Sequence, residues 1–490
     1  MNLSLLEIKN IDYSLLNKID SDRFNYLNDS QLIAVTNIYG NFLVLAGAGT
    51  GKTQILILRT YLLLQLKIPD EKILLITFTR KAANEIKNRI SKIYPNAHLT
   101  IETFHSFALK MIKKNFQNIT FNIIDTSESL KILKSILKNY KLKNEHFTSA
   151  FSPEQLLLIF DRAKSLRLNI SQVLNSSQIK YLDDILYIHN KFTLYKKICS
   201  YTEFDDIILL FLKFLKEGKI SPKYEFIMID EYQDTDLLQK EVLKILGLNS
   251  NVMAVGDDYQ SIYAFRGAQP ENIFTFPLDF KNTRTIFLKQ NYRSTPEILN
   301  YVNNISKHFL KSSKKLLFSS NSSCHLPTVT IFKDAQSELL NIVKHIRFLL
   351  SKNISLRNIS ILFRDSYRME PFIHEFLKYN IPIEIKADKY NRSSYSSTSS
   401  QALTLSTIHG AKGLEWEYVF IPLLLDKVFP PAQSDLEEER RLFYVACSRA
   451  KKYLFLSFPQ KIYDSLGFFC DISPFVQEID SNLFKIKREE

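Results

Sequence analysis

Short runs of apolar and β-branched residues recur along this chain in two groups. Each run is followed by Gly, Thr or Asp and then by apolar residues at helical spacing. This alternation predicts parallel α/β sheets, in which ligands bind at the carboxyl ends of the strands. The first group predicts strands at Phe42–Leu45, Ile73–Phe78, Phe226–Ile229, Val252–Val255 and Thr285–Leu288. The second group predicts strands at Thr328–Phe332, Ile359–Phe363, Ile381–Ile385, Leu403–Ser406, Tyr418–Ile421 and Tyr453–Ser457.

The stretch from 106 to 199 has a different pattern. It is rich in Leu, Lys and Asn at helical spacing and has few strand signals, so we expect an α-helical insertion in the first sheet domain. The predicted fold class is therefore α/β, with a first domain at 1–105 and 200–278 and a second at 279–490. Within the second domain, the Ser-rich stretch 386–402 is predicted to form a flexible loop.

Composition indicates an ordinary globular enzyme with more than one domain. The chain has 490 residues, of which 45% are hydrophobic and 23% are charged. Its net charge of +13 is compatible with a polyanionic partner such as nucleic acid. The same charge also fits a Lys-rich surface on a protein from an AT-rich genome. Charge alone leaves both explanations open.

The cysteines and the apolar segments exclude several classes of protein. Four widely separated cysteines with no C-x-x-C pair argue against a zinc site, an iron–sulfur cluster or a disulfide framework, and favour a reducing compartment. The N-terminus has no basic start followed by an apolar core, so we expect no secretory signal. No apolar run approaches the length of a membrane span. The sequence thus predicts a cytoplasmic location without a membrane partner.

A glycine-rich segment lies between the first predicted strand and a helical pattern. It consists of Ala46, Gly47, Ala48, Gly49, Thr50, Gly51, Lys52 and Thr53. Its glycines let the backbone wrap around phosphates, and the following helix points its first N–H groups at them. Lys52 can reach the β and γ phosphates, and the Thr53 hydroxyl can ligate magnesium. This predicts an ATP site, although the strict pattern has Gly at the position of Ala46.

Two adjacent carboxylates, Asp230 and Glu231, follow the predicted strand at Phe226–Ile229. Adjacent acids are common on protein surfaces, but a position after a buried strand and downstream of a phosphate loop is more specific. Asp230 would hold magnesium through the shell around Thr53, and Glu231 would orient and deprotonate the attacking water. The predicted cofactors are therefore ATP and Mg²⁺.

Further motifs along the chain resemble those of superfamily 1 DNA helicases of the UvrD/Rep/PcrA type. In order they are Leu27–Gln31, Thr77–Ala83, Thr103–Phe107, Gly256–Ala268, Asn291–Thr295, Thr407–Trp416 and Glu438–Ala450. The resemblance runs through nearly the whole chain. It implies two RecA-like motor domains, with the helical insertion corresponding to the domain called 1B in that family.

The resemblance also implies roles for individual residues. It places Gln31, Arg59 and Tyr292 near the adenine, Glu415 on the ribose and Gln260 beside the γ-phosphate, and it makes Arg293 and Arg449 arginine fingers. The implied DNA contacts are Phe78, Thr103, His105, Tyr263, Phe265 and His409, of which Phe265 stands where the family usually has Trp. Because both fingers lie in the second α/β domain, we expect domain closure and reopening to couple ATP hydrolysis to movement on the strand.

The family's accessory domain 2B is inserted at the position of the Ser-rich stretch, so this chain is expected to lack most of it. The function implied is an ATP-dependent 3′–5′ helicase or translocase acting on single-stranded DNA and its junctions with duplex, in DNA repair, recombination or replication. Three alternatives stay open. They are a translocase that needs a protein partner to unwind duplex, a non-motor protein that uses ATP as a switch, and an RNA helicase of the same superfamily.

Overall fold

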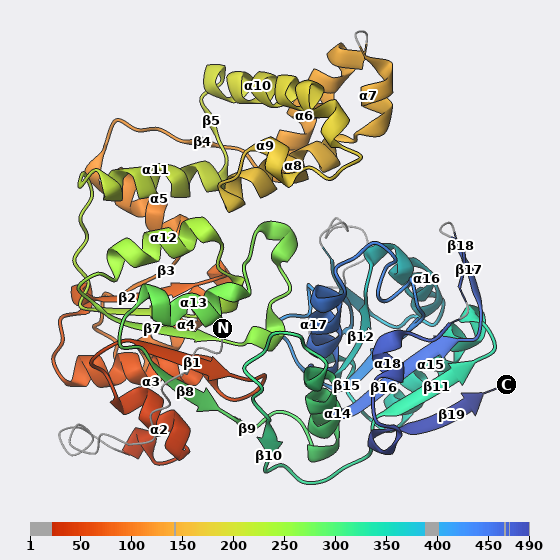
Figure 1. Cartoon of the computed structure of the whole chain (residues 1–490). Helices are drawn as coiled ribbons and strands as arrows, with labels where there is room; N and C mark the ends of the chain where they lie inside the picture. The colour runs from red at the N-terminus through yellow and green to blue at the C-terminus, as the bar shows by residue number, and fades with distance from the viewer. Residues whose placement is uncertain (1–21, 142–143, 388–400, 465–466, 470, 490) are drawn as a thin grey trace. The chain divides into compact units, whose positions relative to one another are not determined.

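The computed structural model describes residues 22–141, 144–387, 401–464, 467–469 and 471–489. The chain divides into two compact units. Unit 1 comprises Met1–Leu45, Lys52–Gly256 and Tyr263–Ile286, and unit 2 comprises Ala46–Gly51, Asp257–Ile262 and Phe287–Glu490. Figure 1 shows the elements of both units. The two units are described separately below.

Unit 1 is built on a six-stranded sheet with the order β3-β2-β6-β7-β1-β8. Its strands are β1 (Phe42–Ala46), β2 (Ile73–Thr77), β3 (Thr100–Thr103), β6 (Phe226–Ile229), β7 (Asn251–Gly256) and β8 (Arg284–Leu288). The first five of these strands run parallel to one another. Every residue of β1, β2 and β6 is buried, as expected for parallel strands that helices cover on both faces. The predicted α/β fold is confirmed.

One strand of this sheet was not predicted. β3 has the sequence Thr-Ile-Glu-Thr, in which a single apolar residue stands among polar ones. β8 belongs to the first sheet, in agreement with the place of Thr285–Leu288 in the first group of predicted strands. Its residues Thr285, Ile286 and Leu288 are buried.

Helices cover this sheet and connect its strands. They are α2 (Asp29–Thr36), α3 (Lys52–Gln65), α4 (Arg80–Ile93), α5 (Phe104–Asn115), α11 (Phe204–Lys216), α12 (Leu237–Leu246) and α13 (Glu271–Asp279). Several begin at a side-chain cap in which a hydroxyl or carboxylate oxygen accepts a backbone N–H, as Thr79, Thr103 and Asp236 do. These caps fix where the helices start at the strand ends.

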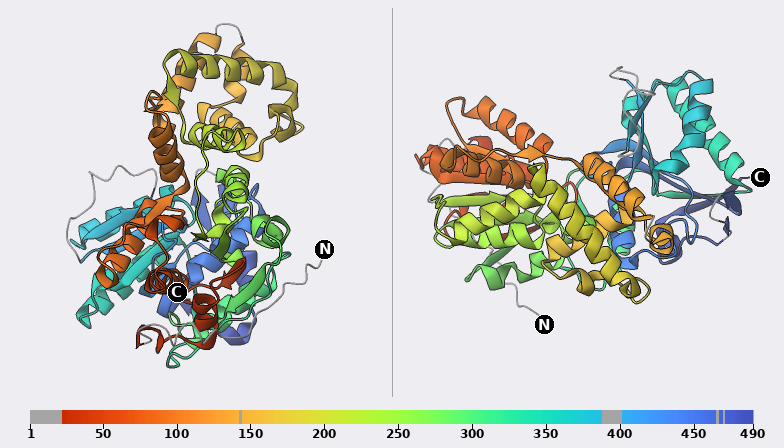
Figure 2. Two further views of the ribbon diagram at one scale, coloured as in Figure 1. Left: turned by 90° about the vertical axis from the view of Figure 1, so that its left-hand side faces the viewer. Right: turned by 90° about the horizontal axis from the view of Figure 1, so that it is seen from above.

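The predicted helical insertion folds around its own core. It contains α6 (Thr126–Lys141), α7 (Glu145–Ala150), α8 (Pro153–Leu166), α9 (Ile170–Val173) and α10 (Leu182–Ile198), bounded by the short strands β4 (Asn122–Ile123) and β5 (Tyr201–Thr202). Figure 2 shows these helices gathered in one group beyond α5 and α11. Leu133, Phe147, Leu156, Ile185 and Ile188 are fully buried at its centre. The insertion therefore has a hydrophobic cluster of its own.

Unit 2 contains a seven-stranded sheet with the order β13-β14-β12-β15-β16-β11-β19. Its strands are β11 (Thr328–Phe332), β12 (Ile359–Phe363), β13 (Ile383–Lys386), β14 (Leu403–Thr407), β15 (Trp416–Ile421), β16 (Ala450–Pro459) and β19 (Lys485–Glu489). Every neighbouring pair is parallel. The edge strand β19, of sequence Lys-Ile-Lys-Arg-Glu, was not predicted; its exposed charged side chains suit an edge position.

The remaining elements of unit 2 complete this second α/β fold. Its helices are α14 (Pro296–Lys307), α15 (Ala335–Ser351), α16 (Glu370–Lys378), α17 (Leu436–Cys447) and α18 (Pro474–Gln477), and its short strands are β9 (Gln290–Asn291), β10 (Phe318–Ser319), β17 (Ile462–Asp464) and β18 (Gly467–Phe469). Apolar residues of α15 and α16 pack on β12 and β14 in one cluster. The predicted Ser-rich loop joins β13 to β14, and its residues 388–400 lie outside the described part of the chain.

Candidate functional site

Several predicted ATP-site residues lie where strands of the first sheet end. Lys52 and Thr53 are the first two residues of α3, which follows β1 and its glycine-rich loop. Asp230 and Glu231 come directly after β6. β1 and β6 belong to one sheet and both run parallel to β7, so their carboxyl ends lie at the same edge. This is the edge at which parallel α/β sheets bind their ligands.

Asp230 is buried next to the carboxylate of Glu231, which disfavours its ionised form. Asp230 is 5% exposed, and its Oδ1 accepts a hydrogen bond of 3.0 Å from the backbone N–H of Glu231. Burial raises the pKa of the Asp230 carboxyl to about 7; the Glu231 carboxylate adds to the rise and the Lys52 ammonium opposes it. Glu231 has a φ of 52°, a left-handed backbone conformation that is uncommon for a residue with a side chain.

Gln233 holds the Glu231 carboxylate, and sequence reasoning gave this glutamine no role. Its Nε2 donates to Glu231 Oε2 at 2.5 Å, and the residue is fully buried. Gly256 lies against it: a Cβ there would come within 2.8 Å of Gln233 Oε1. The absence of a side chain at the end of β7 therefore leaves room for the glutamine that positions the predicted catalytic base.

The residues at this edge fit Mg²⁺. Thr53 offers a hydroxyl and Asp230 a carboxylate, and Mg²⁺ is typically held by one or two carboxylates together with substrate phosphates. The raised pKa of Asp230 also fits a position where a bound cation would compensate its charge. Among the described residues, no group of three or more His, Cys, Asp or Glu could hold a metal ion alone. A magnesium ion here would therefore depend on the nucleotide phosphates.

Gln31 is fixed at the start of α2. Its side-chain Oε1 accepts the backbone N–H of Asn28 at 3.1 Å, and its own N–H donates to Asn28 Oδ1 at 2.9 Å. This reciprocal capping box leaves Gln31 4% exposed. The side chain predicted to contact adenine is thus held in one orientation by the helix terminus.

Arg59 contacts the other end of the same helix. Its guanidinium donates to the carbonyl oxygens of Ala34, Asn37 and Ile38, at 2.8, 2.7 and 2.9 Å. These carbonyls lie where a helix end leaves acceptors unsatisfied. Burial lowers the pKa of Arg59 to about 9, so the group stays charged at neutral pH. These contacts anchor α2, so Arg59 also supports the segment that carries Gln31.

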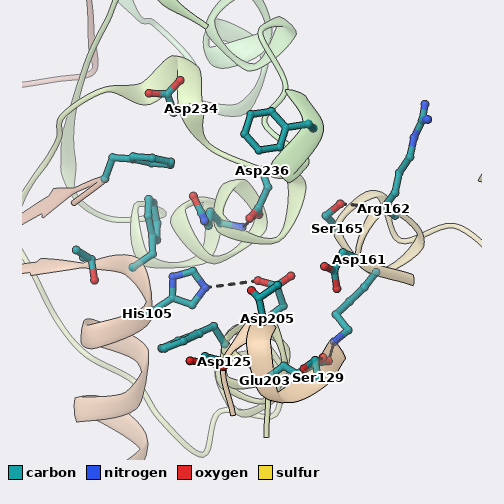
Figure 3. Close-up of a pocket in the computed structure, with 18 of the residues that line it drawn as sticks. His105, Asp125, Ser129, Asp161, Arg162, Ser165, Glu203, Asp205, Asp234 and Asp236 are labelled. Atoms are coloured by element: carbon teal, nitrogen blue, oxygen red, sulfur yellow. Dashed lines mark hydrogen bonds and ion pairs between the residues drawn. The ribbon is translucent and has the colours of Figure 1, made fainter. Parts of the chain in front are cut away.

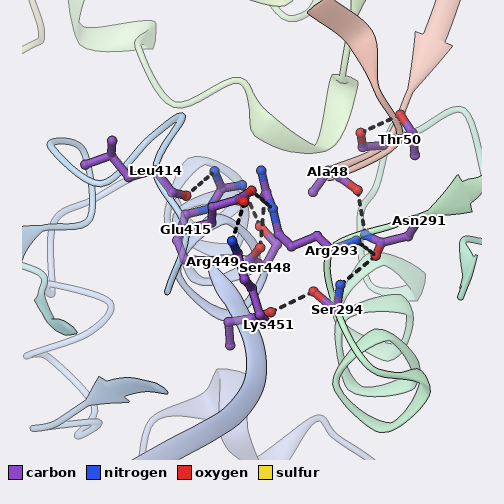
Figure 4. A network of polar contacts seen from close by, with 12 residues as sticks. Ala48, Thr50, Asn291, Arg293, Ser294, Leu414, Glu415, Ser448, Arg449 and Lys451 are labelled. Atoms are coloured by element: carbon purple, nitrogen blue, oxygen red, sulfur yellow. Dashed lines mark hydrogen bonds and ion pairs between the residues drawn. The ribbon is translucent and has the colours of Figure 1, made fainter. Parts of the chain in front are cut away.

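The glycine-rich loop, residues Ala46–Gly51, belongs to unit 2 by its contacts. Asn291 Nδ2 donates to the carbonyl of Ala48 at 2.7 Å (Figure 4). The Tyr292 N–H donates to the carbonyl of Gly49 at 2.9 Å. Within the loop, the Thr50 hydroxyl donates to the carbonyl of Gly47 at 2.9 Å. The Tyr292 side chain is 44% exposed, which leaves ring surface for stacking.

Arg293 lies between a carboxylate and a carbonyl of unit 2. Its Nε donates to Glu415 Oε2 at 2.5 Å, and its Nη1 donates to the carbonyl of Ser448 at 3.1 Å (Figure 4). Lys451 Nζ is 2.7 Å from the other oxygen of Glu415. Although burial opposes ionisation, these two cations hold the pKa of Glu415 below its usual value. The residue predicted to bind ribose therefore also orients a predicted arginine finger.

Arg449, the second predicted arginine finger, is 1% exposed, and all three of its guanidinium nitrogens donate hydrogen bonds. Its Nε donates to the carbonyl of Val445 at 3.0 Å and its Nη1 to the carbonyl of Leu414 at 3.3 Å. Its Nη2 donates both to Ser448 Oγ at 2.8 Å and to Gln260 Oε1 at 3.1 Å. The side chain is thus held by residues from three separate motifs.

A buried ion cluster supports Gln260 from behind. Gln260 Nε2 donates to Asp257 Oδ2 at 2.6 Å, and the other Asp257 oxygen is 2.8 Å from Lys315 Nζ. Lys315 also contacts Asp258 and lies 3.7 Å from the centre of the Tyr259 ring. The side chains of Lys315 and Asp257 are completely buried. No sequence pattern marks Lys315, which is one of several lysines in a short polar stretch.

Three of the residues predicted to contact DNA form an aromatic group in unit 1. Phe78 and Tyr263 are stacked, with ring centroids 5.2 Å apart and planes 21° from parallel. The ring of Phe265 lies 6.0 Å from Tyr263 and is 48% exposed. An exposed aromatic face beside a stacked pair is the arrangement on which bases can stack.

The remaining predicted DNA contacts are held by local interactions. Thr103 caps α5 by accepting the N–H of Ser106 at 3.3 Å. His105, in the first turn of α5, has its Nε2 3.5 Å from Asp205 Oδ1. His409 belongs to unit 2 and lies in the turn that follows β14. The structure thus places Thr103 and His105 close together at the start of α5.

Comparison with known proteins agrees with these observations. Residues 27–281 match the UvrD/REP helicase N-terminal domain, and residues 286–392 and 388–461 match the UvrD-like helicase C-terminal domain. The chain belongs to the UvrD/Rep helicase family. The resemblance inferred from the motifs is therefore confirmed, as is the two-sheet α/β architecture.

Relatives in this family are described as DNA helicases. The chain is 34% identical over 377 residues to an ATP-dependent DNA helicase Rep from Buchnera aphidicola subsp. Schizaphis graminum, covering 74% of this chain and 56% of that protein. It is 36% identical over 376 residues to the Rep helicase of Buchnera aphidicola subsp. Acyrthosiphon pisum, covering 73% and 57%. A probable DNA helicase from Mycoplasma pneumoniae is 30% identical over 466 residues, covering 88% and 83%.

Two further findings concern the extent of the match and the apolarity of the helices. The matched region spans little more than half the length of the two Rep relatives. In the described part of the chain, no helix combines the length and apolarity needed to cross a membrane.

Proposed function

We propose that this UvrD/Rep family protein is an ATP-dependent motor that moves 3′ to 5′ on single-stranded DNA and unwinds duplex, in DNA repair, recombination or replication. One observation carries the proposal: Arg449, Gln260 and the Asp257–Lys315 pair form one continuous buried polar chain in unit 2. An arginine that only forms surface ion pairs needs no fixed, buried position. A guanidinium that must meet a transferring phosphoryl group does need one.

The proposed chemistry is attack of water on the γ-phosphate of ATP. Glu231 would accept the proton of that water, and its orientation is set by Gln233. Lys52, Arg293 and Arg449 would balance the charge that spreads over the phosphate oxygens, and bound Mg²⁺ would supply further positive charge there. Thr53 and Asp230 are the residues proposed to hold the metal. Gln31, Tyr292 and Glu415 are proposed to hold the base and the ribose.

Closure of the motor around ATP and its reopening after hydrolysis would move the strand. Phe78, Tyr263 and Phe265 are proposed as the stacking surface for bases, with Thr103, His105 and His409 as further contacts. The names of the relatives support DNA as the track. Every base has a π-face on which an aromatic side chain can stack, which suits a motor that moves along a single strand.

Strand displacement on tailed duplexes tests this function. The purified chain is incubated with ATP and a duplex that carries either a 3′ or a 5′ single-stranded tail. Displacement only from the 3′ tail is the expected result. Displacement from the 5′ tail alone would overturn the proposed direction, and no DNA-stimulated ATP hydrolysis with either substrate would overturn the motor.

A second candidate is a translocase that needs a protein partner for unwinding. The observation that favours it is the pairing of β13 with β14, in register from Ile383 and Leu403 onward, at the position of the family's accessory domain. DNA-stimulated ATP hydrolysis without strand displacement would select this function. Competition between single-stranded DNA and RNA for ATPase stimulation tests the track, and equal stimulation by RNA would exclude a DNA-specific motor.

A further inference from the structure

Unit 1 contains a cavity of about 650 Å³ that the ATP chemistry does not use. Its lining residues come from α5, α11 and α12 and from α6 and α8 of the helical insertion. Its volume falls within the range of about 300–1,000 Å³ typical of small-molecule pockets. Phe78 and Phe265, two of the proposed DNA contacts, are part of its lining. The cavity is therefore continuous with the proposed stacking surface.

Carboxylates dominate the charged lining. The acidic residues are Asp125, Asp161, Glu203, Asp205, Asp234 and Asp236, and the basic ones are Arg162 and Lys164. Lys164 is already paired, since its Nζ is 2.7 Å from Glu203 and 2.9 Å from Asp206. His105 faces Asp205 at 3.5 Å, as Figure 3 shows. A phosphate would be repelled by this lining, so the backbone of a nucleic acid cannot be the occupant.

One buried acceptor in this lining has no donor. Gln239 is 7% exposed, and its side-chain Oε1 has no hydrogen-bond partner among the described residues. The residue is held in place by its backbone N–H, which donates to Asp236 Oδ1 at 2.8 Å. An unsatisfied buried acceptor costs about 1–3 kcal/mol, so such groups usually have a partner. The cavity thus offers an acceptor to a ligand that carries N–H donors.

The residues that line the cavity indicate which kind of ligand it can bind. The lining includes the aromatic residues Phe78, Phe104, Phe204 and Phe265, against which a flat π-system can stack. A metal ion is not supported, because no cluster of described residues has the ligands for one. A planar group with amino donors at one edge and its negative charge kept outside satisfies all of these observations.

We propose that this cavity receives the amino-bearing edge of a nucleobase, with the phosphates of the strand left outside. This rests on the proposed function as a motor on single-stranded DNA. Cytosine, adenine and guanine each carry an exocyclic amino group that can donate to Gln239 Oε1 or to a neighbouring carboxylate. Thymine presents two carbonyl oxygens beside its single N–H donor, and those oxygens meet acceptors. The strand is therefore bound with a preference for cytosine over thymine.

The test compares pyrimidine homopolymers, which match in ring size and stacking. Fluorescence anisotropy measures the binding of labelled oligo(dC) and oligo(dT) of equal length to the full chain at one salt concentration. Oligo(dC) is expected to bind roughly tenfold more tightly, the discrimination that one good hydrogen-bonded contact gives. Equal affinities for the two oligonucleotides would overturn the inference.

A variant links the preference to the cavity. Gln239→Met removes the acceptor while keeping the length of the side chain, and it leaves no polar group unpaired. The ratio of the two affinities is expected to fall toward one. Gln477→Met, an exposed glutamine on unit 2, is the matched control and should keep the wild-type ratio. A ratio that Gln239→Met leaves unchanged would also overturn the inference.

The outcomes also separate this inference from the proposed function. ATP hydrolysis is measured on the same preparations with each oligonucleotide. If both stimulate hydrolysis and bind equally, the motor stands and the base preference is wrong. If neither binds nor stimulates, the proposed function itself fails.

Discussion

Arg449 and Gln260 are joined by a hydrogen bond of 3.1 Å from the arginine Nη2 to the glutamine Oε1. Gln260 is in turn bound to Asp257, and Asp257 to Lys315. A predicted arginine finger and a predicted γ-phosphate sensor therefore share one buried polar chain. Residues coupled in this way act as a unit, so the loss of one should displace the next.

Replacement of Arg449 by lysine should reduce kcat for ATP hydrolysis on the order of 10³-fold, with little change in KM. Lysine keeps the positive charge but cannot donate to Gln260, Ser448 and two backbone carbonyls at once. Steady-state ATPase measurements with single-stranded DNA check this. Arg357→Lys, at an exposed position on unit 2, is the matched control. Wild-type kcat in Arg449→Lys would remove Arg449 from the catalytic group.

Lys315→Met should both destabilise the protein and lower kcat. The substitution leaves Asp257 and Asp258 buried without their counter-ion, which costs about 3–5 kcal/mol for a broken buried pair. Thermal unfolding measures the first effect. For the second, the double variant with Gln260→Ala should be no slower than Gln260→Ala alone, because Lys315 acts through Gln260. Fully additive losses in kcat would show that Lys315 acts on catalysis independently of Gln260.

Gly49→Ala should abolish ATP binding, whereas Gly218→Ala should lower stability by only about 1 kcal/mol. Both glycines have a φ near +67°. At Gly49 an added Cβ would lie 2.6 Å from the Cβ of Arg293 and 2.9 Å from Asn291 Nδ2, while nothing lies within 4 Å at Gly218. Binding of a fluorescent ATP analogue distinguishes the two variants. Equal affinities would show that the close approach of the loop is not needed.

Glu338 should make stability depend on pH. It is fully buried in α15, and burial raises the pKa of its carboxyl from 4.5 to about 7. A group with a raised folded-state pKa stabilises the fold below its unfolded pKa and loses that contribution as pH rises through the folded value. Glu338→Gln does not titrate, so its advantage over the wild type should grow from pH 5 to pH 8 by on the order of 3 kcal/mol. A melting-temperature difference that is constant over this range would contradict the expectation.

The sequence predicted the features that depend on local pattern. The buried strands that end beside Ala46 and Asp230 are visible in the sequence as apolar runs. The phosphate loop and the two adjacent acids consist of consecutive residues, so they can be recognised without knowledge of the fold. The motifs therefore identified the family. The edge strand β19 and the polar strand β3 were missed because pairing and position, rather than their own apolar pattern, make them strands.

Residues that act through contacts distant in sequence could not be predicted. Lys315 is separated from Asp257 by 58 positions and appears in the sequence as an ordinary surface lysine. Gln239 likewise belongs to a regular amphipathic helix, and only the cavity reveals its unpaired oxygen.

The most direct test of the account is the steady-state ATPase rate of the wild type and of Glu231→Gln, each with and without single-stranded DNA. Glutamine keeps the shape of the side chain beside Gln233 but cannot accept the proton of water. We predict that DNA stimulates the wild type, and that Glu231→Gln binds ATP but does not turn it over. Hydrolysis in Glu231→Gln at the wild-type rate would contradict the mechanism, and a wild-type rate that DNA does not change would contradict the motor.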